Sequence, residues 1–176
     1  MKKSTLNLAA AITLIALGVL LRVLPHPANF APVAAIAIFG GAVLPRKYAL
    51  WVPLGAMMLS DAVIGFHSLI PVTWGCYGLI ALASSVWMRK PALGRGAVLT
   101  LSSSIFFFAV TNFAVWARSG MYVHTLNGLA TCYAMALPFF RNTVLSDAIY
   151  TAALFGALAL ANRLAIKSSL VSDKAA

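Results

Sequence analysis

The sequence contains very few charged residues, and acidic residues are almost missing. Only 3 of its 176 residues are Asp or Glu, and 9% are charged in all, whereas soluble domains carry about 25%. A chain of this composition cannot cover a water-facing surface, which excludes a soluble domain. Its two cysteines, Cys76 and Cys132, are too few for a disulfide framework and form no zinc motif. The sequence has no Gly-rich loop ending in Lys and Ser or Thr, so the chain cannot hydrolyse ATP alone.

Long apolar runs take the place of these missing features. Hydrophobic residues make up 62% of the chain, and a spanning helix needs about 20 residues. We therefore predict an all-α integral membrane protein, a bundle of six transmembrane helices that forms one domain over residues 1–176. The predicted spans are residues 6–24, 32–44, 48–65, 71–88, 97–116 and 143–164. Residues 118–140 are less regular, and we expect a short helix around residues 126–137.

The basic residues predict the orientation of the bundle. With the N-terminus in the cytoplasm, ten Lys and Arg residues fall on the cytoplasmic side and three on the outer side. This positive-inside bias agrees with an even number of spans, so we expect both termini in the cytoplasm and the chain in the inner membrane. The first apolar run resembles a signal peptide but is followed by no small-residue cleavage site, so we expect it to remain as the first helix. The basic residues form no patch or arm, so we expect no nucleic-acid partner. The outer three are Arg22, Arg118 and Arg141, and the inner ten include Lys2, Arg46, Lys47, Arg89 and Lys90.

Polar and aromatic residues collect on the outer side of this topology. All three histidines, both cysteines and the two acidic residues outside the tail lie there. A carboxylate at bilayer depth costs roughly 2.5–3.5 kcal/mol on insertion scales, so Asp61 and Asp147 need partners, which Arg118 or Arg141 could supply. This concentration predicts a ligand pocket that opens to the outside. The candidate binding residues are His26, Asn29, Asp61, His67, Trp74, Tyr77, Asn112, Trp116, Arg118, Tyr122, Tyr133, Phe139 and Arg141.

Several of these polar residues also have a purely structural interpretation. Trp116 and Tyr122 are at positions where aromatic side chains often form a belt at the membrane–water interface. Asp147 is placed to cap the start of the sixth helix. Asp61 precedes a helix break and can bond the amides of the turn that follows. Each residue alone fits these interpretations, whereas their concentration on one side favours a pocket.

Several segments of the chain resemble one family of membrane proteins. They read RVLPHPANFAPVAAIAIFGGA, PLGAMMLSDAVIGFH, TNFAVWARSGMY and NGLATCYAMALPFFRNTVLSDAIY. Over nearly its whole length the chain resembles the substrate-binding S-components of energy-coupling-factor (ECF) vitamin transporters, most closely the solitary cobalamin (vitamin B12) S-components called BtuM. The resemblance implies a six-helix bundle that captures cobalamin from outside, with no intrinsic cofactor. It also implies a membrane-embedded coupling subunit and two cytoplasmic ATPases as partners that supply energy.

The resemblance also suggests a role for Cys76. If the fourth helix starts at residue 71, Cys76 lies about 7 Å below the outer surface. Its sulfur would then bind an axial position of cobalt, which accepts a soft thiolate. A thiolate ligand would also labilise an upper ligand such as cyanide, giving Cys76 a catalytic role in removing it. The alternatives are a buried cysteine acting as a small hydrophobic residue, a disulfide with Cys132, or His67 or His26 as the cobalt ligand.

The corrin itself would need aromatic walls and hydrogen bonds along its amide rim. The wall candidates are Trp74, Tyr77, Trp116, Tyr122, Tyr133, Phe139 and Phe140, and the rim candidates are Asn112, Asn127, His26 and Arg141.

Three other functions are compatible with the sequence. The first is an S-component-like carrier of another small vitamin or precursor. The second is a membrane enzyme that uses Asp61, His67 and Cys76, although no nucleophile–base spacing stands out. The third is a structural protein without a ligand, which would leave the clustering of polar residues unexplained.

Overall fold

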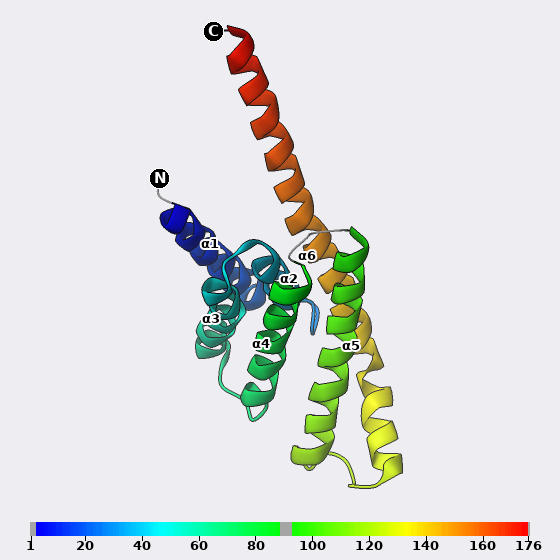
Figure 1. The fold of residues 1–176 in the computed structure, drawn as a ribbon. Helices are drawn as coiled ribbons and strands as arrows, with labels where there is room; N and C mark the ends of the chain where they lie inside the picture. Colours follow the sequence, from blue (N-terminus) through cyan, green and yellow to red (C-terminus); the bar gives the residue numbers. More distant parts are fainter. Residues whose placement is uncertain (1–2, 89–92, 176) are drawn as a thin grey trace.

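The chain forms a bundle of α-helices. The computed structural model describes residues 3–88 and 93–175, and in this part of the chain it contains six helices and no strand (Figure 1). The predicted all-α fold is therefore confirmed. The basic residues Lys2, Arg89 and Lys90 of the orientation argument lie outside the described residues. The helices are α1 (Lys3–Val23), α2 (Val33–Val43), α3 (Arg46–Ile64), α4 (Ile70–Trp87), α5 (Leu93–Arg118) and α6 (Leu126–Ala175).

Four of these helices are long and apolar enough to cross a membrane. They contain the segments Ser4–Val23, Ile70–Trp87, Gly94–Arg118 and Leu126–Leu164, so the chain is a multi-pass membrane protein. The segment in α6 has 39 residues, which corresponds to roughly 58 Å of helix at 1.5 Å per residue. The hydrocarbon core of a bilayer is about 30 Å thick, so this helix extends well beyond it. α2 has 11 residues, roughly 16 Å, which is about half of that thickness.

The C-terminal part of the chain differs from the prediction. We expected a short helix around residues 126–137 within a less regular stretch, and a sixth helix from residue 143. The structure has one continuous helix with Pro138 inside it. In a membrane a helix break would expose unsatisfied backbone groups to lipid, and this penalty outweighs the cost of the proline. The prediction of two separate helices was therefore wrong.

The short helix α2 lies at the centre of the bundle. It packs against α1, α3, α4, α5 and α6, and residues 33–38 are each no more than 3% exposed. A helix that is apolar all round is expected to be buried in this way. α4 approaches α2 closely at Gly41, where an added Cβ would lie 2.7 Å from the carbonyl oxygen of Ala81. Beside this contact Ser84 Oγ donates a 2.6 Å hydrogen bond to the carbonyl of Ile38 and joins the two helices.

The other close pairs are α1 with α3 and α5 with α6. The α5–α6 hairpin extends below the rest of the bundle in Figure 1, and both chain ends lie on the opposite side. The last turn of α1, the last turn of α3 and the first turns of α4 contact one another. This meeting point, called here the cavity end, carries the candidate site.

Candidate functional site

A buried ion pair joins three helices at the cavity end. Arg22 Nη1, at the end of α1, lies 2.5 Å from Asp61 Oδ1, near the end of α3. The same nitrogen also donates to Ser60 Oγ. Trp74 Nε1, on α4, donates a 2.7 Å hydrogen bond to the second carboxylate oxygen, Asp61 Oδ2. The Asp61 side chain is 0% exposed and that of Arg22 is 17% exposed, so the charge of the carboxylate is balanced inside the protein.

This ion pair corrects two interpretations of Asp61. The carboxylate does not bond turn amides, and its partner is neither Arg118 nor Arg141. Sequence reasoning assigned Arg22 only to topology and missed it as a partner. The available signal was that Arg22 and Asp61 both lie near the end of an apolar run, and the predicted topology directs these two runs the same way. Two such residues reach the same depth, although only the tertiary structure shows that α1 and α3 are neighbours.

A cavity of about 500 Å³ opens beside the ion pair. This volume lies within the range of small-molecule sites. Predicted binding residues that line it are His26, Asn29, His67 and Tyr77. The remaining lining residues, which the sequence did not single out as binding residues, are Arg22, Val23, Leu24, Pro25, Ala31, Met57, Ile64, Thr73, Phe107, Thr143 and Asp147. Five helices and the α1–α2 loop thus contribute to one polar hollow in an otherwise apolar bundle.

The α1–α2 loop forms one wall of the cavity. His26 Nδ1 lies 2.8 Å from the carbonyl oxygen of Pro27, and its Nε2 lies 3.0 Å from that of Arg22. Asn142 Nδ2, on α6, donates a 2.9 Å hydrogen bond to the carbonyl of Ala28. These bonds attach the loop both to the end of α1 and to α6. The cavity wall is therefore held in place by side chains from two distant parts of the chain.

Aromatic rings form the opposite wall. Tyr77, on α4, stacks on Phe107, on α5, with ring centroids 4.9 Å apart. Cys76 precedes Tyr77 but is 2% exposed and is not among the residues that line the cavity. Both Cys76 and Cys132 are free thiols, so the predicted alternative of a disulfide between them is wrong.

The predicted residues on the α5–α6 hairpin serve a different purpose. Trp116 Nε1 donates to the carbonyl of Val123, and Tyr133 Oη donates to that of Ala109 at 2.6 Å. Asn112 Nδ2 bonds its own helix at the carbonyl of Phe108. These contacts hold the hairpin together. None of the hairpin candidates lines the cavity: Asn112, Trp116, Arg118, Tyr122, Asn127, Tyr133, Phe139, Phe140 and Arg141.

Asp147 is the second acidic residue at the cavity. It lies in the interior of α6 and is 2% exposed, so the prediction that it caps the start of a helix was wrong. Its Oδ2 lies 2.7 Å from Ser104 Oγ on α5. The carboxyl therefore faces the cavity on one side and a hydroxyl of the neighbouring helix on the other.

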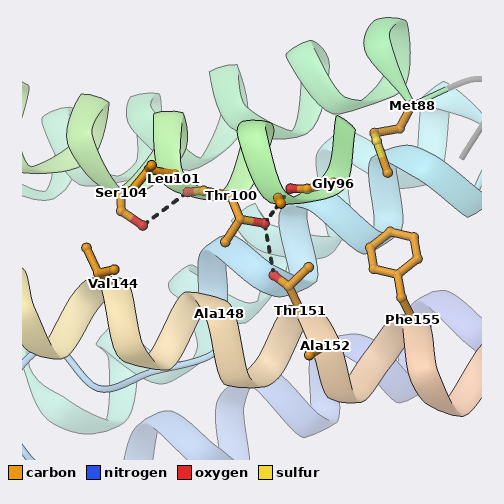
Figure 2. A pocket seen from close by; sticks show the side chains of 11 residues that line it. Met88, Gly96, Thr100, Leu101, Ser104, Val144, Ala148, Thr151, Ala152 and Phe155 are labelled. Atoms are coloured by element: carbon orange, nitrogen blue, oxygen red, sulfur yellow. Dashed lines mark hydrogen bonds between the residues drawn. The ribbon is translucent and has the colours of Figure 1, made fainter. Parts of the chain in front are cut away.

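Ser104 also lines a second hollow, called here the α5–α6 groove (Figure 2). The groove has a volume of about 480 Å³. Apolar side chains including Leu101, Val144 and Phe155 line most of it, and the hydroxyls of Thr100, Ser104 and Thr151 lie along it (Figure 2). Thr100 Oγ1 donates to the carbonyl of Gly96 and lies 3.5 Å from Thr151 Oγ1. The cavity and the groove thus lie on opposite sides of the Asp147–Ser104 contact.

Comparison with known proteins gives one match. Residues 2–169 match a family of unknown function, DUF6580. The chain belongs to this family. No curated protein and no solved structure matches it.

The described residues of this DUF6580 protein contain no group of three or more His, Cys, Asp and Glu side chains that could hold a metal ion. The chain's own polar groups at the cavity are suited to hydrogen bonds and charge interactions with a small molecule.

Proposed function

We propose that the chain is a membrane carrier that takes a small ligand from the outer side into the cavity. The observation that carries this proposal is a cavity of about 500 Å³ with both polar and apolar lining inside an apolar bundle, with a buried ion pair beside it. Polar groups in a membrane interior are costly, and they typically mark a ligand or ion pathway. The positive-inside bias of the sequence supports an orientation with this end of the bundle outside and both termini in the cytoplasm.

The ligand that the sequence resemblance implies is cobalamin. In this proposal Cys76 binds cobalt as a thiolate through an electron pair of its sulfur. An upper cyanide then leaves with its own electron pair and takes up the thiol proton of Cys76 as hydrogen cyanide, so cobalt is neither oxidised nor reduced. Cys76 lies behind the cavity wall, next to Tyr77, so cobalt ligation requires α4 to turn or the bundle to open. A coupling subunit and two ATPases would supply the energy for release.

An absorption spectrum of the detergent-purified protein tests this assignment. The protein is incubated with cyanocobalamin, and free ligand is removed before the measurement. We expect stoichiometric corrin with a shifted spectrum, and we expect Cys76→Ser to abolish the shift. Cys132→Ser is the matched control, because Cys132 is equally buried but lies on α6 and bonds the carbonyl of Asn112. Bound corrin with an unshifted spectrum would support cobalamin as the ligand and contradict the proposed cobalt–sulfur bond. If no corrin is bound, cobalamin is not the ligand.

A carrier for a smaller vitamin or precursor is the second candidate. The volume of the cavity and the position of Cys76 outside its lining favour it, because a corrin needs a wider pocket than the closed bundle offers. The same spectrum separates the two candidates. The enzyme alternative has less support, since Asp61 is occupied by Arg22 and Trp74 and Cys76 does not reach the cavity.

A further inference from the structure

Asp147 is a buried carboxyl group without a cationic partner in the described part of the chain. The ion pair found there joins Arg22 to Asp61, which leaves Asp147 with Ser104 as its hydrogen-bond partner. The side chain is 2% exposed and lies inside a membrane-spanning segment. A lone carboxylate in such a place is strongly disfavoured, and intramembrane carboxyl groups often act in ion or proton pathways.

Among the residues that the structure describes, none with an ionisable side chain is seen to pair with Asp147 by direct contact. α6 packs against α5 and α2. The sequence of α2 contains no ionisable residue, and the ionisable residues of α5 are Arg95 and Arg118, in its first and last turns. Across the cavity lie Arg22, His26, His67 and Tyr77, of which Arg22 already bonds Asp61.

The hydrogen bonds of Ser104 indicate which form of Asp147 fits the structure. Ser104 Oγ lies 2.7 Å from Asp147 Oδ2 and 3.1 Å from the carbonyl oxygen of Thr100. A hydroxyl has a single proton to donate, and the carbonyl can only accept. If Asp147 were ionised, the Ser104 hydroxyl could donate either to the carboxylate or to the Thr100 carbonyl, which also accepts the backbone N–H of Ser104 within α5. If Asp147 is protonated, its O–H donates to Ser104 and Ser104 donates to Thr100, so both contacts are made at once.

The carboxyl of Asp147 borders the cavity and does not line the α5–α6 groove. Asp147 lines the cavity, whereas the opposite side of the contact is the α5–α6 groove, whose walls are mostly apolar (Figure 2). A proton acceptor such as water is stable in the polar cavity but not among Leu101, Val144 and Phe155. The lining therefore favours the cavity over the groove as the route for exchange of a proton.

We propose that Asp147 is an intramembrane proton-binding site, neutral in this conformation, that exchanges its proton with water in the cavity. On ionisation the Asp147 O–H bond breaks and the proton passes to a water molecule. Ser104 must then turn its hydroxyl toward the carboxylate and give up its bond to Thr100. Loss of the proton thus changes the contact between α5 and α6. If the chain is the carrier proposed above, this site couples its opening to a proton, and only this last step rests on the proposed function.

Infrared spectroscopy of the full chain in lipid nanodiscs tests the site without any ligand. The chain has only three acidic side chains, Asp61, Asp147 and Asp173, so the C=O stretch of a protonated carboxylic acid can be assigned. We expect this band at neutral pH, and we expect Asp147→Asn to remove it. Asp173→Asn is the control and should retain the band, because Asp173 lies beyond the spanning segment Leu126–Leu164.

A second variant and a titration keep the test independent of whether Asp147→Asn folds. Ser104→Ala removes the acceptor of the Asp147 proton, so the band should remain and shift. Raising the pH of the wild-type sample should remove the band reversibly. Absence of the band at neutral pH, its survival in Asp147→Asn, or an unshifted band in Ser104→Ala would overturn the proposal. Failure of cobalamin binding would leave the band unaffected, so the two proposals fail separately.

Discussion

Replacement of Arg22 by methionine tests how strongly the buried ion pair holds α1, α3 and α4 together. The variant keeps an apolar stem of similar length but leaves the fully buried Asp61 carboxylate with the Trp74 indole and no cation. Removing one partner of a buried ion pair typically costs about 3–5 kcal/mol. The Arg22 side chain is 17% exposed and borders the cavity, so water partly screens the pair. We therefore expect a loss of about 2–3 kcal/mol in the free energy of unfolding, below that range because of this screening.

A double-mutant cycle with Asp61→Asn separates the ion pair from other effects of the substitutions. Removing both charges leaves no buried unpaired ion, so the double variant should lose clearly less than the sum of the two single variants. Interhelical hydrogen bonds in membrane proteins show coupling energies of about 0.6 kcal/mol on average, with a maximum near 1.7 kcal/mol. We expect a coupling energy of about 2 kcal/mol, above the value for neutral bonds. The assay is unfolding by sodium dodecyl sulfate in mixed micelles, followed by circular dichroism. Additive losses would refute the argument that the two charges stabilise each other.

Two further substitutions test the packing of α2 and the orientation of the bundle. Gly41→Ala should lower the free energy of unfolding by about 1–3 kcal/mol, because the new Cβ would overlap the backbone of α4. Gly75→Ala is the control: nothing lies within 4 Å of its added Cβ, so it should be neutral or stabilising, and equal losses in both variants would contradict the packing argument. For the orientation, Ser68→Cys in the α3–α4 turn should react with a membrane-impermeant thiol reagent added outside intact cells. Lys47→Cys, at the other end of α3, should react only after lysis, and the reverse pattern would invert the proposed topology.

The positions of the helices were largely predictable from the sequence. The apolar runs, which are separated by prolines and basic residues, located α1 to α5 to within a few residues. This works because a single segment inside a bilayer satisfies its backbone hydrogen bonds by forming a helix. The exception was α6, which we expected as two separate helices and which continues through Pro138. Whether a proline ends a helix depends on two free-energy costs: that of leaving backbone groups without hydrogen bonds at a break, and that of keeping the proline inside the helix. The membrane and the neighbouring helices decide which cost is larger.

The lining of the cavity was much less predictable. His26, Asn29, His67 and Tyr77 were singled out and do line it, whereas Trp116 and Tyr133 were singled out equally and instead hold the α5–α6 hairpin together. In a soluble helix a polar face indicates which side points outward. Here both the lipid-facing and the buried sides are apolar, so the sequence gives little information about how each helix is rotated about its axis.

By itself the sequence determined that the chain is a multi-pass membrane protein with helical spans and that its two carboxylates away from the tail need partners. Those conclusions depend on composition and on the energetic cost of charge in lipid, which act on each residue wherever its neighbours lie. The choice of partners was decided only by the tertiary structure. Arg22 reaches Asp61 because α1 lies beside α3, and Asp147 meets only the Ser104 hydroxyl because α6 lies beside α5. Contacts between helices far apart in the chain depend on which helices pack together, and that is a property of the whole bundle rather than of any one segment.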